Sequence, residues 1–166
     1  MTTTLLDLDR LRRLAPPPEI PLEPGHPARW PAVEATLGTT LPDDYKEFVT
    51  AYGTGMFDDF LSVFTPFAVD SDGNLLCQRD VTPPPAYPGP DSLLPVGRTQ
   101  NGDQIFWSTE GEPDGWPVVA LASSSTEPER HELGLVPFLA WLLGGTLATA
   151  VFPPELGEGV HLFTPG

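Results

Sequence analysis

The stretch that decides the fold runs from Trp30 to Gly53 and reads W-P-A-V-E-A-T-L-G-T-T-L-P-D-D-Y-K-E-F-V-T-A-Y-G. Its first part predicts a short helix, because apolar residues recur at helical spacing and Gly38 supplies a left-handed cap. Pro42 begins a second helix, with Asp43 and Asp44 in the first turn, where the helix dipole favours acids. This second helix carries an apolar stripe at i, i+3, i+4 and i+7 spacing, formed by Tyr45, Phe48, Val49 and Tyr52.

This stretch resembles the SUKH superfamily, which includes the fungal Smi and Knr regulators and many bacterial immunity proteins. The pattern W-x-x-x-E-x-x-L-G-x-x-L-P-x-D-Y-x-x-F, followed by a Gly, falls on Trp30, Glu34, Leu37, Gly38, Leu41, Pro42, Asp44, Tyr45, Phe48 and Gly53. Later segments follow in the family's order and extend the resemblance to residues 28–152. We therefore expect three parts: an N-terminal extension (1–27) with a short helix and a proline-rich tether, a SUKH-like domain (28–152) and a C-terminal tail (153–166).

After Gly53 the pattern changes from helical to strand-like. Aromatic and β-branched residues fill 57–67, D-S-D-G-N at 70–74 predicts a hairpin turn, and 75–79 reads as the returning strand, with Cys77 as a packed thiol. The proline-rich segment 82–91 predicts a surface loop, because proline cannot donate to a sheet ladder. Further strands are expected at 93–99, 104–109, 118–121 and 130–134, the first two joined by a Q-N-G-D turn.

Residues 133–154 contain no charged side chain, which raises a membrane-spanning alternative. Pro137 suits a helix start and Gly144-Gly145 a stop, however, and the two turns or so between them are too short to cross a bilayer. A buried core helix is the preferred interpretation. The resemblance implies an α+β fold: two N-terminal helices and a C-terminal helix packed around a mainly antiparallel sheet of about five or six strands. The strand and turn signals agree with it.

Composition restricts the classes of function. The chain has 166 residues, enough for one domain with a real core, and a net charge of −15. From Thr99 onward there are nine acidic residues and one base, Arg130. Such a surface repels nucleic acid and anionic membranes and attracts a basic protein, although solubility alone is an alternative explanation. The single cysteine and the absence of an apolar secretory segment favour the reducing cytoplasm.

The sequence contains no complete catalytic or metal-binding motif. The three histidines, His26, His131 and His161, lack ligand spacing, and 70–81 departs from a calcium loop in both its Gly and its final ligand. The chain has no G-x-S-x-G motif and no P-loop. We therefore expect no enzyme activity, no cofactor and no metal.

The resemblance implies a function in protein binding. Bacterial SUKH proteins are typically immunity factors that neutralise a cognate polymorphic toxin, often a nucleic-acid-directed enzyme, and the Ala, Gly and Pro bias favours this branch. A nuclease needs basic groups to bind phosphate, so an acidic inhibitor would imitate its substrate and be steered to it. The alternative is a non-catalytic adaptor or regulatory scaffold that binds protein partners, as among the fungal relatives.

The predicted partner surface combines acids from two places. The first set follows the L-P corner, which is Leu41-Pro42 between the two predicted helices, and comprises Asp43, Asp44, Glu47, Asp58 and Asp59. The second set lies in the turns around two tryptophans and comprises Asp103, Trp107, Glu110, Glu112, Asp114 and Trp116. Two alternatives stay open: the acids only solvate the surface, and the tryptophans are core residues rather than binding hot spots in an acidic rim.

Overall fold

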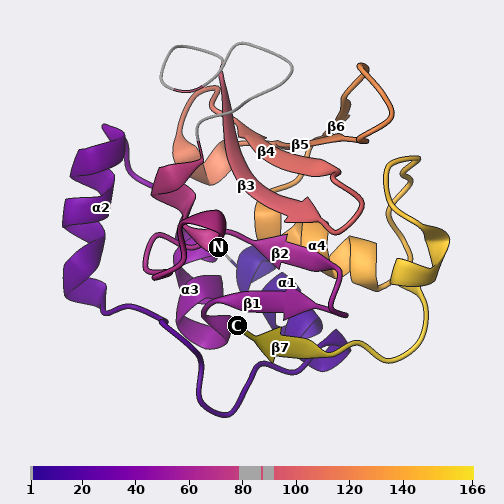
Figure 1. Ribbon diagram of the computed structural model, residues 1–166, viewed down its shortest axis with the longest axis horizontal. Coiled ribbons are helices and arrows are strands. Elements are labelled where there is room, and N and C mark those ends of the chain that lie inside the picture. Colours follow the sequence, from indigo (N-terminus) through magenta and orange to yellow (C-terminus); the bar gives the residue numbers. More distant parts are fainter. Residues whose placement is uncertain (1, 79–86, 88–91) are drawn as a thin grey trace.

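The computed structural model describes residues 2–78, Tyr87 and residues 92–166. Over this part of the chain the protein is α+β, as expected, with α-helices on one side of an antiparallel sheet (Figure 1). The α-helices are α1 (Thr2–Leu14), α2 (Trp30–Leu37), α3 (Asp43–Tyr52) and α4 (Leu135–Leu143).

The sheet has seven strands among the described residues, rather than five or six, in the order β6-β5-β4-β3-β2-β1-β7. They are β1 (Gly55–Phe57), β2 (Leu61–Val63), β3 (Leu93–Thr99), β4 (Gln104–Ser108), β5 (Val118–Leu121), β6 (Glu129–His131) and β7 (Phe163–Pro165). All neighbours pair antiparallel. The count is higher partly because the expected tail supplies β7, which pairs with β1 at one edge.

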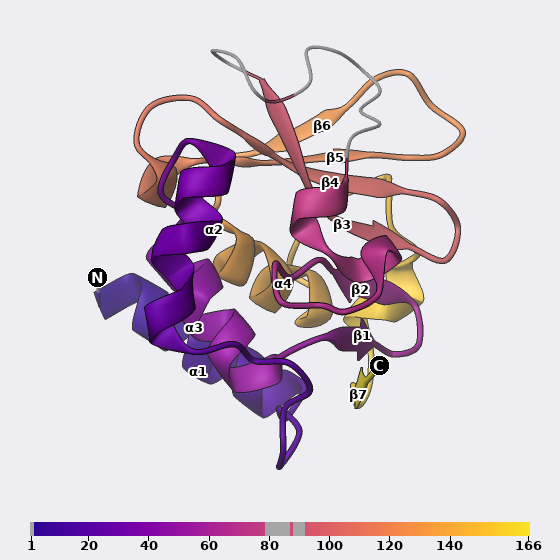
Figure 2. The same ribbon diagram turned by 60° about the vertical axis from the view of Figure 1, so that its left-hand side comes forward.

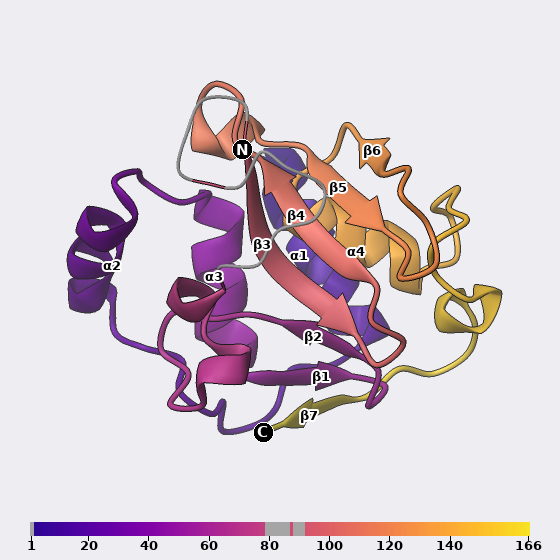
Figure 3. The ribbon, with the colours of Figure 1, turned by 45° about the horizontal axis from the view of Figure 1, so that its top comes forward.

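The core lies between the sheet and a layer of helices. Figure 3 shows α1, α3 and α4 behind one face of the sheet, while α2 stands at its side. The predicted stripe of α3 faces inward, and its residues Tyr45, Phe48, Val49 and Tyr52 are all fully buried. Amphipathic periodicity therefore located the core face of α3 correctly.

The L-P corner between α2 and α3 is held by two residues of the motif. The Glu34 carboxylate accepts a hydrogen bond from the Leu41 backbone N–H at 2.7 Å and pairs with Lys46 Nζ at 2.9 Å. The Tyr45 hydroxyl donates to the Phe64 carbonyl at 2.6 Å, which ties α3 to the segment after β2. Gly38 ends α2 at φ 78°, the left-handed cap that the sequence predicts.

Both chain ends pack on this core. Leu8 and Leu11 of α1 are buried, and the Tyr52 hydroxyl donates to the Ala15 carbonyl at 2.7 Å. Phe163 of β7 contacts the Tyr52 ring edge-on, with ring centres 5.0 Å apart. Boundaries at residues 27 and 152 stay predictions about folding units, but the packing argues that α1 and β7 belong to the same unit as residues 28–152.

The region after β2 differs from the prediction. Residues 70–74 do not form a hairpin turn: Asp70 and Asn74 each accept a backbone N–H two residues ahead and start successive 3₁₀ turns, Ser71–Gly73 and Leu75–Cys77. These local side-chain bonds compete with a strand ladder. The expected returning strand at 75–78 is therefore wrong, and Cys77 is exposed rather than packed. Arg79 and the predicted proline-rich loop, except Tyr87, lie outside the described residues.

Within the uncharged segment 133–154, residues Leu135–Leu143 form α4, the core helix expected in place of a membrane span. α4 is nine residues long, and both Phe138 and Leu139 on it are fully buried. Nowhere in residues 2–78, 87 and 92–166 is there a helix long and apolar enough to cross a membrane.

Candidate partner-binding surface

Four of the predicted acids form an exposed group at the start of α3. The Asp43 backbone N–H donates to Asp114 Oδ1 at 2.8 Å, which joins α3 to the turn between β4 and β5. Asp43 and Glu47 lie one helical turn apart on α3, and Glu112 shares the turn with Asp114. All four side chains are exposed, and within the described chain none has a basic nitrogen within 4 Å. We call this group the acidic corner (Asp43, Glu47, Glu112 and Asp114).

Asp44 is next to the acidic corner but serves the fold. It is buried, and its two carboxylate oxygens accept the backbone N–H groups of Tyr45 at 2.8 Å and Val136 at 3.2 Å. The second bond caps the start of α4. Burial raises the pKa of Asp44 against these two hydrogen bonds, and the negative charges of Asp114 and Glu47 raise it further. Two residues of the acidic corner therefore raise the pKa of this neighbouring carboxyl.

Asp58 and Asp59 lie elsewhere, in the turn between β1 and β2, on the right in Figure 1, whereas α3 is on the left. Both adopt positive φ, 55° and 51°. Asp58 accepts from the Leu162 N–H at 2.9 Å and lies 2.6 Å from Nδ1 of the buried His161. The other ring nitrogen of His161 lies 2.7 Å from the Leu143 carbonyl. Asp58 therefore holds the segment before β7, and only Asp59 is left exposed.

Asp103 is also a structural residue. It is buried at the end of the turn between β3 and β4, where the sequence placed a hairpin. Its carboxylate accepts from the Thr99 hydroxyl at 2.7 Å and from the Ser123 N–H at 3.0 Å. It joins this turn to the segment after β5, and it is not available to a partner.

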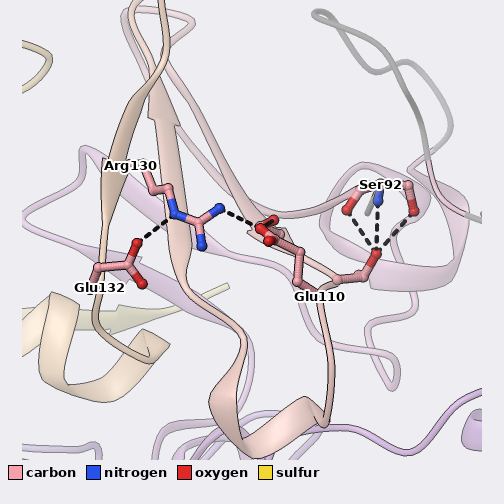
Figure 4. A network of polar contacts seen from close by, with 6 residues as sticks. Ser92, Glu110, Arg130 and Glu132 are labelled. Atoms are coloured by element: carbon pink, nitrogen blue, oxygen red, sulfur yellow. Dashed lines mark hydrogen bonds and ion pairs between the residues drawn. The ribbon is translucent and has the colours of Figure 1, made fainter. Parts of the chain in front are cut away.

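Glu110 has a basic partner within the chain. Figure 4 shows the Arg130 guanidinium between Glu110 and Glu132, and the Ser108 hydroxyl also donates to Glu110. The Ser108 hydrogen bond and then Arg130 hold the pKa of Glu110 below its usual range. This network ties β6 to the turn after β4, and it uses the single base that follows Thr99.

Trp107 and Trp116 are core residues, so of the two alternatives the structure selects the core. Their side chains are 0% and 3% exposed. Trp107 meets the Tyr45 ring edge-on, with ring centres 4.8 Å apart, and Trp116 donates to the Gly111 carbonyl at 3.2 Å. Neither indole can touch a partner in this structure, so the acidic corner has no tryptophan hot spot of its own.

Sequence reasoning missed a groove that is lined by residues of α1, α3 and the start of α2. Figure 2 shows how these three helices are arranged. Its volume is about 500 Å³, and Leu8 and Trp30 contribute to its lining. Glu47 lines it as well, so the groove adjoins the acidic corner. The leucines at 5, 8 and 11 are a helical stripe that could have indicated it, but they precede residue 28, where the family resemblance begins.

The placement of the His, Cys, Asp and Glu side chains bears on metal binding. Over residues 2–78, 87 and 92–166 no group of three or more His, Cys, Asp or Glu side chains is arranged to hold a metal ion. The acidic corner carries negative charge, so it attracts cationic groups.

Comparison with family models identifies the class of protein. The SUKH_6 family model, described as SMI1-KNR4 cell-wall, matches residues 28–135. The chain therefore belongs to the SUKH superfamily, and the motif at residues 30–53 lies inside the matched region. Comparisons with curated proteins and with solved structures find no match.

Proposed function

We propose that this protein is a bacterial immunity protein that works in the cytoplasm and has no catalytic activity of its own. It binds a cognate toxin with a basic surface and covers the groups that the toxin uses on its substrate. Membership of the SMI1-KNR4 family is consistent with a role in protein binding. The observation that carries the proposal is the acidic corner, in which four exposed carboxylates have no basic partner within the described chain.

The physical mechanism is electrostatic. Carboxylates gathered without counter-charges repel one another, and a lysine or arginine of a partner relieves that repulsion on binding. The net charge of −15 adds long-range attraction for a cationic protein. Fast capture matters because the toxin acts in the same cell, and steering raises the association rate more than the affinity.

The test is a charge-neutralised variant, Asp43→Asn, Glu47→Gln, Glu112→Gln and Asp114→Asn together. Its partner in the assay is the product of the neighbouring gene, which this proposal expects to be the toxin. We expect the association rate at low salt to fall about tenfold or more, and its dependence on salt to flatten, because steering by the corner is lost. Cells that express the toxin should lose protection.

A matched control neutralises four other exposed acids, Asp59, Glu127, Glu155 and Glu158. Both variants change the net charge by the same amount, so a difference between them reports position rather than total charge. Equal loss in both variants would show that only net charge matters. Intact protection with the corner neutralised would remove the corner from the toxin interface.

The adaptor alternative predicts different behaviour. A scaffold would bind signalling or assembly proteins, and its gene would have no toxin gene beside it. Wild-type protein that fails to protect cells from the neighbouring gene product would favour the adaptor.

A further inference from the structure

The groove between α1, α2 and α3 is lined by residues from three separate stretches of the chain. Leu8 comes from α1, Trp30 is the first residue of α2, Pro27 lies in the 3₁₀ turn just before it, and Thr50 comes from α3. Leu8 and Trp30 form an apolar floor whose side chains are 5% and 7% exposed. A hollow of about 500 Å³ has room for one large side chain of a partner.

Two acids, Asp9 and Glu47, and two bases, Arg12 and Lys46, line the groove, but one of the bases is already paired with an acid outside it. Lys46 lines it, but its ammonium already pairs with Glu34 at 2.9 Å and lies 5.7 Å from the centre of the Trp30 ring. Asp9 on α1 and Glu47 on α3 also line the groove, and neither has a basic nitrogen within 4 Å in the described chain. Arg12 is the opposing cation, and no described carboxylate oxygen lies within 4 Å of it.

The groove also continues into the acidic corner. Glu47 belongs to both, and Asp43 lies one helical turn before it on α3. A ligand anchored in the groove would therefore have carboxylates beside it on the α3 side. Protein interfaces draw most of their binding energy from a few buried anchor residues, while charges at the rim direct approach and orientation.

We propose that the groove receives a large apolar side chain from a partner segment in which lysine or arginine flanks that anchor. The apolar floor selects the anchor, and Asp9, Glu47 and the acidic corner select the flanking cations. The proposal deepens the proposed function, since such a segment would belong to the toxin, but its chemistry can be tested without the toxin.

The experiment uses the full chain and three blocked tripeptides, Lys-Trp-Lys, Glu-Trp-Glu and Lys-Gly-Lys, followed by amide chemical shifts. Lys-Trp-Lys should shift groove amides and bind about tenfold more tightly than Glu-Trp-Glu, because attraction to exposed carboxylates is replaced by repulsion. Lys-Gly-Lys should give little shift, because it lacks the anchor. Equal or tighter binding of Glu-Trp-Glu, or shifts confined to other surfaces, would overturn the proposal.

Thr50→Trp should fill the groove and weaken Lys-Trp-Lys binding at least tenfold. Thr36→Trp is its matched control: both threonines are exposed, and each hydroxyl donates to the carbonyl four residues earlier in its helix. Thr36 does not line the groove. Undiminished binding in Thr50→Trp would place the peptide elsewhere, and a dimer that only Thr50→Trp dissolves would identify a second copy as the occupant.

Two further results separate this proposal from the proposed function and from misfolding. Glu47→Lys changes one exposed charge and should narrow the preference for Lys-Trp-Lys over Glu-Trp-Glu, whether or not Thr50→Trp folds. An unchanged preference would remove Glu47 from the site.

If the peptide binds in the groove but no toxin is neutralised, the groove stands and the immunity function fails. If the toxin is neutralised equally by Thr50→Trp, the immunity function stands and the groove is not its interface.

Discussion

The packing of α1 against the core predicts that the N-terminal segment contributes to the stability of the whole fold. Leu11 is 0% exposed and belongs to the main core, whereas Leu6 on the same helix is 62% exposed. Leu11→Ala should lower the free energy of unfolding by about 2–5 kcal/mol, through lost burial and the cavity left behind. Leu6→Ala makes the same chemical change on the surface and should stay within about 0.5 kcal/mol.

The assay is the midpoint of chemical denaturation, followed by far-ultraviolet circular dichroism and by tryptophan fluorescence. Both probes should shift together in Leu11→Ala if α1 unfolds with the rest of the molecule. Alanine is a good helix former, so neither change should weaken α1 through helix propensity. Equal small shifts in the two variants would refute the reasoning and support an N-terminal extension that folds independently of residues 28–152.

Three other predictions concern one core side chain and two side chains that join distant segments through hydrogen bonds. Phe48→Ala, in the centre of the α3 stripe, should cost about 3–5 kcal/mol of unfolding free energy, and an unchanged denaturation midpoint would show that the ring is not core. Burial raises the pKa of Glu129, but hydrogen bonds from Thr149, Ala150 and His131 lower it by more. Its net stabilisation should therefore be present at pH 7 and be lost as the pH falls through the lowered pKa. The difference in unfolding free energy between wild type and Glu129→Gln should shrink as the pH falls below the ordinary glutamate pKa of about 4.3 and vanish below the lowered pKa, and a difference that persists in acid would point to packing rather than charge. His161→Ala should cost about 2–4 kcal/mol and speed amide exchange in β7, because Asp58 and the Leu143 carbonyl lose their shared partner; the exposed His26→Ala should do neither.

The helices around the L-P corner could be predicted because their signals are local. The stripe of α3 and the glycine cap of α2 depend on spacing within one or two helical turns. The β3–β4 hairpin was likewise marked by a turn of four residues, and Gly102 in it adopts φ 86°. At 70–74 the same kind of turn signal gave a wrong prediction, because the side chains of Asp70 and Asn74 accept hydrogen bonds from backbone N–H groups two residues ahead and no hairpin forms.

The candidate surface depended on tertiary structure. Acids look alike in a sequence, and only packing separates Asp43, which is exposed, from Asp44, which caps α4 ninety-two residues away. The same holds for Glu110, whose counter-charge comes from Arg130 on another strand. Trp107 sits beside an acidic turn in the sequence, but its ring lies against Tyr45 in the core.

By itself, therefore, the sequence determined the family, the fold class, the core face of α3 and the excess of negative charge. These properties depend on local periodicity, on turn residues and on composition, all of which are present in a linear string. Tertiary structure alone decided which carboxylates remain free, that both chain ends complete the core, and that a groove opens between α1, α2 and α3. Those outcomes depend on contacts between residues far apart in the chain, whose geometry is set only when the helices and the sheet pack together.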